Sequence, residues 1–259
     1  MTMTKNLAVK VPAVTAIFWI IKVLATTVGE TFADFLNGLF ADSLGLSDSQ
    51  SLILVSGVMG GVLAVLLIIQ FAATKYIPVI YWSTIVFISV AGTLITDNLH
   101  DGMGVELWVT TVVFALLLAL VFFIWHRQEK TLEMKSINTR KREAYYWLAI
   151  LFTFALGTSA GDQFAESFGF GYALSLVIFA VAIFVVWFAY KRQWMSAVSA
   201  FWVAYILSRP LGASVGDLLA SPAKEGGLAL GTTITSVVFL AAILGAVLWL
   251  TVSKRDEIK

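Results

Sequence analysis

A motif with two carboxylates spaced four residues apart recurs along the 259-residue chain. Three copies have the form Thr-x-x-x-acid-x-x-x-acid, and in the fourth copy alanine and serine replace the threonine and the second acid. The copies are Thr26/Glu30/Asp34, Thr93/Asp97/Asp101, Thr158/Asp162/Glu166 and Ala213/Asp217/Ser221. On a helix, this spacing places both acids on one face, about 6 Å apart along the axis.

The chemistry that this motif predicts is cation binding. Seven of the sixteen Asp and Glu residues belong to it, and they lie within or at the ends of long apolar segments. A carboxylate inside an apolar span is costly and by default indicates function, and clustered carboxylates need cations or protons to neutralise them. We expect the first acid of each copy to be a metal ligand: Glu30, Asp97, Asp162 and Asp217.

The second acids, Asp34, Asp101 and Glu166, lie nearer the expected membrane boundary. Two interpretations stay open for them: they bind the ion, or they flank the helices in water. The threonines lie one turn deeper than the first acids. They either supply neutral oxygens to the ion or bond to their own helix backbone; they are Thr26, Thr93 and Thr158.

Two basic residues occupy matching positions inside the apolar segments. Lys22 and Arg209 each lie eight residues before the first acid of copies 1 and 4. A buried cation needs a counter-charge, so they either form fixed ion pairs or act as mobile counter-ions that hold the carboxylates without substrate. On the second interpretation, the diagonally placed repeats 1 and 4 differ from repeats 2 and 3.

Small residues precede the first acid in three copies, namely Gly29, Gly161 and Gly216. They indicate either close helix packing or a local helix break that turns backbone carbonyls toward an ion. His100 is the only histidine near the acids, and it either senses pH or has no functional role.

Composition excludes several classes of protein. Hydrophobic residues make up 59% of the chain and charged residues 13%, which is typical of a membrane protein. The absence of cysteine excludes disulfides and thiolate metal sites, and we expect no cofactor apart from a transported cation. The net charge of +1, carried in short loops, argues against nucleic-acid binding. No nucleotide-binding loop or nucleophile motif is present, so we expect that the protein is not an enzyme.

Eight apolar segments are long enough to cross a bilayer as helices. They run at about 13–36, 52–73, 78–100, 105–125, 144–166, 171–190, 196–220 and 229–252. Fourteen of the seventeen Lys and Arg residues lie at the two termini and in every second connection, among them 126–143. By the positive-inside rule, both termini and the 126–143 connection are cytoplasmic. No segment outside the apolar spans is long enough to fold as a second domain, so 1–259 is expected to be one transmembrane domain.

The motif marks a two-helix repeat, with copies at about 11–75, 76–126, 144–192 and 195–253. Each repeat has an even number of spans, so all copies share one orientation and are related by rotation about the membrane normal. The sequence thus predicts an all-α membrane protein of four tandem helical hairpins, with the acids in a ring near the external side. Trp82, Trp147 and Trp202 fall fifteen residues before the first acid in copies 2, 3 and 4.

The phrases TTVGETFADF, LITDNLHDG, TSAGDQFAESFGFG and ASVGDLLASP carry a resemblance to a known family. Together with the tryptophans, they resemble a bacterial membrane-protein family defined as a repeat of unknown function. The resemblance covers nearly the whole chain and implies the four-hairpin fold in a bacterial inner membrane, but it implies no activity.

We expect a transporter for a hard divalent cation of the Mn²⁺, Mg²⁺ or Ca²⁺ class, because the available ligands are oxygens from Asp, Glu, Thr and Asn98. The same acids can take up protons when the metal leaves, which favours proton-coupled export, and a channel stays an option. Two alternatives are an organic or drug-like cation held by tryptophan over a carboxylate, and a non-transporting scaffold or sensor. The expected partners are the cation, protons and the lipid bilayer, and an oligomer is left open.

Overall fold

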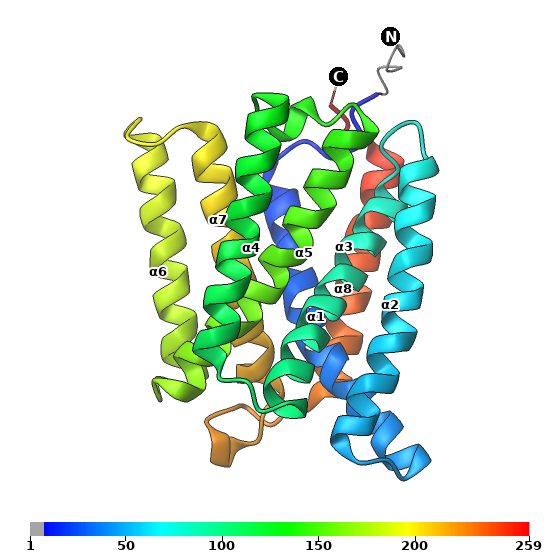
Figure 1. The fold of residues 1–259 in the computed structure, drawn as a ribbon, viewed down its shortest axis with the longest axis vertical. Helices are drawn as coiled ribbons and strands as arrows, with labels where there is room; N and C mark the ends of the chain where they lie inside the picture. Colours follow the sequence, from blue (N-terminus) through cyan, green and yellow to red (C-terminus); the bar gives the residue numbers. More distant parts are fainter. Residues whose placement is uncertain (1–7, 259) are drawn as a thin grey trace.

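The computed structural model describes residues 8–258, which form eight α-helices and no β-strand. All eight helices are long and apolar enough to cross a membrane. The chain is therefore an integral membrane protein, as the sequence predicts. The expected domain, 1–259, extends beyond the described residues at both ends. The helices stand side by side, and the two chain ends lie together at one end of the bundle (Figure 1).

The helices form four consecutive hairpins. Their bounds are α1 (Ala16–Leu44) and α2 (Asp48–Ala72), α3 (Pro78–Asp97) and α4 (Leu107–Glu129), α5 (Arg140–Asp162) and α6 (Gly171–Lys191), α7 (Ala197–Ala220) and α8 (Thr232–Ser253). Short π-helical segments continue α3 and α5, at Asn98–Gly102 and Gln163–Ser167. Two 3₁₀ turns lie in connections, at Met134–Ser136 and Ala223–Glu225.

Local sequence signals explain where the helix ends differ from expectation. The first helix was expected to end near residue 36, but it continues to Leu44. There Gly45 adopts a left-handed conformation (φ 63°) that ends the helix. Similarly, α5 begins at Arg140, before the expected residue 144, because the Thr139 side chain accepts a hydrogen bond from the Arg142 backbone N–H and caps it.

The helices are arranged in an inner ring and an outer shell. In the inner ring, α1, α3, α5 and α7 pack on one another in sequence, and α7 closes the ring onto α1. Each outer helix packs chiefly on the inner helix of the next hairpin: α2 on α3, α4 on α5, α6 on α7 and α8 on α1. This is the expected rotational arrangement about the membrane normal. The inner helices are the more buried set, and the outer helices leave most of their apolar surface exposed, as lipid contact requires.

Glycines allow close approach within the inner ring. Gly92 and Gly157 each lie five residues before the first acid of their repeat. A Cβ on Gly92 would lie 2.6 Å from the Cβ of Phe154, and one on Gly157 would lie 2.5 Å from the Cβ of Arg209. Small residues at such positions let membrane helices pack closely. The backbone of α5 at Phe154 therefore lies close to α3, and the backbone of α7 at Arg209 lies close to α5.

Candidate functional site

The first acids of the four repeats converge on one cavity, at the end of the inner ring remote from the chain ends. Glu30 comes from α1, Asp97 and Asp162 are the last residues of α3 and α5, and Asp217 lies near the end of α7. All four line a cavity of about 190 Å³. Because the repeats are related by rotation about one axis, the same motif position reaches the same depth on each inner helix.

The second motif position lines the same cavity in all four repeats, with Asp34, Asp101, Glu166 and Ser221. Asp34, Asp101 and Glu166 are exposed, whereas Glu30 is buried and the other three first-position acids are half-buried. The first acids therefore form a deep tier and the second acids a tier at the opening. Both tiers together present seven carboxylates, because the fourth repeat supplies a hydroxyl in place of the eighth.

The helix geometry at the acids differs between repeats. In α1, Glu30 and Asp34 lie on a continuous α-helix, as the spacing predicts. In repeats 2 and 3 the α-helix ends at the first acid, and the second acid, Asp101 or Glu166, lies in the π-helical turn that follows. A π turn changes the direction of the side chain relative to an α turn and is frequent at functional sites.

Arg209 closes the base of the cavity. Its guanidinium is fully buried, and Nη2 donates to Glu30 Oε2 at 2.7 Å and to the hydroxyls of Thr158, at 2.6 Å, and Thr93. Nη1 donates to the backbone carbonyl of Thr26 at 3.4 Å. One cation from repeat 4 is thus bonded to the inner helices of repeats 1, 2 and 3. This arrangement neutralises one carboxylate, and within residues 8–258 the other six that face the cavity have no lysine or arginine bonded to them.

The repeated threonines lie beneath the acids, as their spacing predicts, but they are not among the residues that line the cavity. The hydroxyls of Thr93 and Thr158 accept from Arg209 and donate to the backbone carbonyls of their own helices, at 3.3 and 3.2 Å. The Thr26 hydroxyl donates to the Val23 carbonyl at 2.7 Å. In this conformation all three threonines bind the arginine, Thr93 and Thr158 through their hydroxyls and Thr26 through its backbone carbonyl. The Thr93 hydroxyl also lies 3.4 Å from Glu30 Oε2.

Lys22 is fully buried one level below, and it differs from Arg209 in its contacts. Its Nζ lies 4.2 Å from the centre of the Phe154 ring and 4.3 Å from that of Tyr205. Among the described residues, this ammonium has no hydrogen-bond acceptor and no carboxylate partner. The expectation that repeats 1 and 4 are diagonal is wrong: α1 and α7 are neighbours in the ring, because the fourth repeat closes onto the first.

The small residues before the acids lie in regular helix, so the helices do not break at them. Gly29 packs directly against Ser89 of α3, and a Cβ there would lie 2.6 Å from the serine Cβ. Gly216 approaches the Thr27 carbonyl, with 3.2 Å for an added Cβ, while Gly161 has ordinary contact distances of 3.6 Å and above. Close helix packing therefore explains Gly29 and Gly216. The change from α-helix to π-helix occurs after the first acid, in repeats 2 and 3.

His100 lines the cavity beside the second acid of repeat 2. Its Nδ1 is 2.9 Å from the backbone carbonyl of Val105, and its Nε2 is 4.0 Å from Asp101 Oδ1. A backbone bond at one ring nitrogen leaves the other nitrogen facing the acids.

The tryptophans Trp82, Trp147 and Trp202 are buried in the half of the inner ring nearer the chain ends, and none lines the acidic cavity. Trp202 donates to the Leu132 carbonyl at 2.9 Å, in the α4–α5 connection. The cavity wall holds one aromatic residue, Tyr172 of α6. The arrangement therefore separates the aromatic residues from the carboxylates by depth.

The end of the bundle with the chain ends is closed by buried polar contacts. Lys10 forms an ion pair with Glu143 at 2.5 Å, and both side chains are buried. Gln70 donates to the other carboxylate oxygen of Glu143 at 3.2 Å. These bonds join the segment before α1 to α2 and α5.

Four cavity-lining residues are not among the candidates of the sequence analysis: Asn37, Leu52, Thr96 and Tyr172. Asn37 lies seven residues after Glu30, two helical turns along, and its side-chain oxygen is buried without a hydrogen-bond partner. Tyr172 comes from an outer helix. Asn37 lies on the part of α1 beyond residue 36, where the sequence analysis ended this helix. The position of Tyr172 in the sequence has no spacing relation to the acids.

Within residues 8–258, no three His, Asp or Glu side chains are close enough together to hold one metal ion directly. The carboxylates surround a space without touching one another. The arrangement suits a cation that keeps part of its water shell between itself and the acids, or one that draws the acids inward when it binds.

The comparisons with known proteins agree with the repeat pattern. The family model described as Repeat of Unknown Function (DUF347) matches residues 17–76, 80–131, 145–193 and 200–256. The chain belongs to this family, which confirms the expected resemblance. No curated protein and no solved structure matches the chain.

Proposed function

We propose that this member of the repeat family transports a hard inorganic divalent cation, of the Mn²⁺, Mg²⁺ or Ca²⁺ class, in exchange for protons. The observation that carries the proposal is the single cavity lined by every acid of the repeated motif. Seven carboxylates around one space create a strongly negative potential, and such a potential attracts cations or protons to neutralise it.

The chemistry of the wall favours a hard cation. Its polar groups are carboxylate, hydroxyl and amide oxygens, and His100 is the one nitrogen ligand among the lining residues. Oxygen ligands suit Mg²⁺, Ca²⁺ and Mn²⁺ better than copper or zinc. Since a water molecule occupies about 30 Å³ in the liquid, a cavity of about 190 Å³ has room for an ion with several waters. Mg²⁺ in particular usually keeps several waters in protein sites.

Arg209 supplies a mechanism for controlling the site. It holds Glu30 at 2.7 Å and closes the cavity toward the other side. A divalent cation that enters competes with the guanidinium for the same carboxylate. Release of Arg209 from Glu30 would break the ion pair that joins repeat 4 to repeat 1, which couples binding to a change in the ring.

The charge distribution supports an orientation in which the cavity opens outward. The chain ends and the α4–α5 connection, which carry most Lys and Arg residues, lie at the opposite end from the acids (Figure 1). By the positive-inside rule this end is cytoplasmic, and the membrane is the bacterial inner membrane. We rank an organic cation lower, because Trp82, Trp147 and Trp202 line no part of the cavity. A scaffold or sensor explains neither the cavity nor the concentration of charge.

The test is the metal content of bacterial cells that express the protein or an empty vector. Cells are grown with Mn²⁺, Mg²⁺, Ca²⁺, Zn²⁺ or Cu²⁺ in turn, and the content of each metal is measured by mass spectrometry. We expect the content of one or more of the first three to change, with zinc and copper unaffected. Unchanged content and unchanged toxicity for the whole panel would overturn the proposal.

A further inference from the structure

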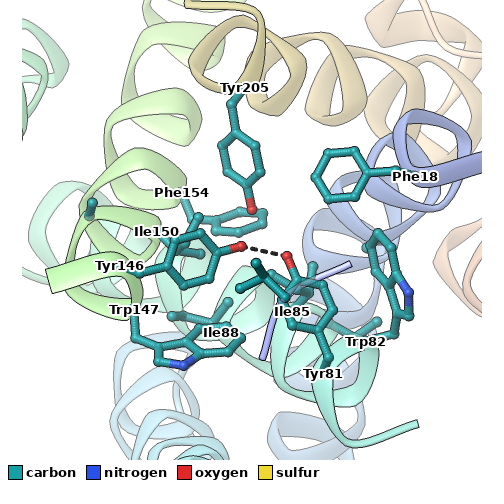
Figure 2. Packing of buried hydrophobic residues seen from close by; sticks show 14 of the residues in the cluster. Phe18, Tyr81, Trp82, Ile85, Ile88, Tyr146, Trp147, Ile150, Phe154 and Tyr205 are labelled. Carbon is teal, nitrogen blue, oxygen red and sulfur yellow. Dashed lines mark hydrogen bonds between the residues drawn. The ribbon is translucent and has the colours of Figure 1, made fainter. Parts of the chain in front are cut away.

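Beneath Arg209, the axis of the inner ring is filled by aromatic side chains. Figure 2 shows Tyr81, Tyr146 and Tyr205 with their hydroxyl groups gathered in the middle of this packing. We call these three residues the tyrosine cluster. They come from α3, α5 and α7, and all three are fully buried. Phenylalanine would fill nearly the same space, so packing alone does not explain the hydroxyl groups on the axis.

Two of the three hydroxyl groups of the cluster are bonded to each other, and the third faces them. The hydroxyls of Tyr81 and Tyr146 share a short hydrogen bond, and the Tyr205 hydroxyl points toward this pair in Figure 2. The Tyr205 oxygen is buried and has no hydrogen-bond partner within residues 8–258. Buried polar atoms are normally hydrogen-bonded to protein or to ordered water. The cluster therefore supplies a set of exchangeable protons in an otherwise apolar region.

On the side of the acidic cavity, the cluster continues to Lys22. The ammonium lies 4.3 Å from the centre of the Tyr205 ring and lacks a hydrogen-bond acceptor. Its charged neighbour is Arg209, whose guanidinium lies over the same Phe154 ring at 5.8 Å. On α1, Lys22, Thr26 and Glu30 follow one another at four-residue spacing and so lie on one helix face. Lys22 therefore lies along α1 two turns from Glu30 and against the ring of Tyr205, between the level of the carboxylates and the cluster.

On the side of the chain ends, the cluster continues to Tyr76 and Asp256. The rings of Tyr76 and Tyr81 are in edge contact at 5.7 Å, and the Tyr76 hydroxyl donates to Asp256 Oδ2 at 2.5 Å. The second carboxylate oxygen of Asp256 is buried without a partner. Burial raises the pKa of Asp256 above its ordinary value and also raises the pKa of Tyr76. Both residues lie outside the membrane-spanning helices, near the cytoplasmic surface in the proposed orientation.

We propose that Lys22, the tyrosine cluster, Tyr76 and Asp256 form the proton pathway between the acidic cavity and the cytoplasm. This proposal rests on the proposed cation–proton exchange. The Lys22 ammonium gives one proton to the Tyr205 oxygen while Tyr205 passes its own hydroxyl proton to the Tyr81–Tyr146 pair, and the Lys22 amine that results then takes up a proton from a cavity carboxylic acid. The Tyr76 oxygen then takes up a proton from the pair, and Tyr76 passes its own hydroxyl proton to the Asp256 carboxylate, which releases it to the cytoplasm. No group in the pathway changes its net proton count, and the reverse sequence carries protons outward.

The packing around the cluster separates the two transported species. Rings fill the space between the hydroxyls, so a hydrated divalent ion has no room on this route, whereas a proton needs only the oxygen atoms (Figure 2). The acidic cavity binds both species, and only protons use the tyrosines. Removal of a single hydroxyl should therefore uncouple proton movement from cation binding.

The experiment compares wild-type protein with Tyr146→Phe and Tyr205→Phe in proteoliposomes that contain a pH-sensitive dye. Each substitution removes one oxygen and keeps the ring. The matched control is Tyr145→Phe, because Tyr145 is the neighbouring residue on α5 and stacks on Trp125 of α4 outside the cluster. Addition of Mn²⁺ starts proton movement, and calorimetry measures Mn²⁺ binding to each purified variant.

We expect both cluster variants to lose proton movement by roughly 100-fold, the lower range for a positioned proton-transfer group. Mn²⁺ binding should stay at the wild-type level, and Tyr145→Phe should behave as wild type. Normal proton movement in both cluster variants would overturn the pathway and leave the carboxylate site intact. Mn²⁺ binding by the wild type without any proton movement would also overturn the pathway. If the wild type binds no divalent cation, the proposed function fails, and the pathway fails with it.

Discussion

The two halves of the inner ring are built by the same four helices and have opposite chemistry. In the half remote from the chain ends, seven carboxylates face an open cavity. In the other half, tyrosine, tryptophan and phenylalanine side chains fill the axis completely. Rotational repetition explains both, because it multiplies whatever lies at a given motif position. A repeated acid becomes a ring of like charge, and a repeated aromatic residue becomes a closed plug.

The halves meet at the position eight residues before the first acid, where the four repeats carry four different residues. Here the four inner helices carry Lys22, Ser89, Phe154 and Arg209. Both cations come from neighbouring helices, and both lie over the ring of Phe154. The departure from symmetry is thus concentrated at one level. This level separates a site that binds cations from a region that excludes them.

The largest expected effect comes from removing charge in the deep tier. Asp162→Asn should reduce cation transport to background with near-normal expression, because the amide keeps the size and loses the charge. Glu30→Gln should do the same, with lower stability, since it leaves Arg209 buried without its counter-charge. Transport is measured as Mn²⁺ flux in proteoliposomes. Asp42→Asn is the control, because Asp42 is an exposed acid of α1 that does not line the cavity.

The same assay compares the tiers. Asp34→Asn and Glu166→Gln should reduce flux less than the deep-tier changes, because these acids are exposed at the opening and water screens their charge. Wild-type flux in both deep-tier variants would exclude those acids as essential, and the contrast between the two halves would then have no bearing on transport.

The next effect concerns the boundary between the halves. Arg209→Met should lower the free energy of unfolding by about 3–5 kcal/mol, the range for breaking a buried ion pair from one side. The double variant Arg209→Met/Glu30→Gln should recover part of this loss, since neither charge then remains unpaired. Chemical denaturation of the purified protein in detergent measures both, and the double-mutant cycle gives the coupling energy. Additive losses would show that the pair makes no contribution of its own.

The smallest expected effect is a pH dependence of Mn²⁺ affinity, which concerns only the half of the inner ring that contains the acidic cavity. Protons and Mn²⁺ compete for the same oxygens, so Mn²⁺ affinity should fall as the pH is lowered from about 8 to about 6. If one proton competes with each ion, the fall is up to about tenfold per pH unit. Calorimetry in buffers of different ionisation enthalpy also counts the protons released. Equal affinity at both pH values with no proton release would leave a cation site and exclude exchange by competition.

Much of this protein could be predicted from its sequence. Apolar segments of membrane length give the helices, and an even number of spans in each repeat requires rotation about the membrane normal. The acid spacing then places every copy at one depth, and the prediction that the acids gather in one ring matches the cavity lining. These conclusions depend on local periodicity and on the repeat, which a single chain displays in full.

Other features were decided only by the tertiary structure. The partners of Arg209 lie 51 to 183 residues away along the chain, and closure of the ring between α7 and α1 brings them together. That closure makes repeats 1 and 4 neighbours, and packing of the inner helices around Arg209 brings the hydroxyls of Thr93 and Thr158 to it. The hydroxyl groups of Tyr81, Tyr146 and Tyr205 meet because three helices converge on one axis. Spacing within one helix fixes which face a residue occupies, but the side chain it meets across the axis depends on how the helices pack.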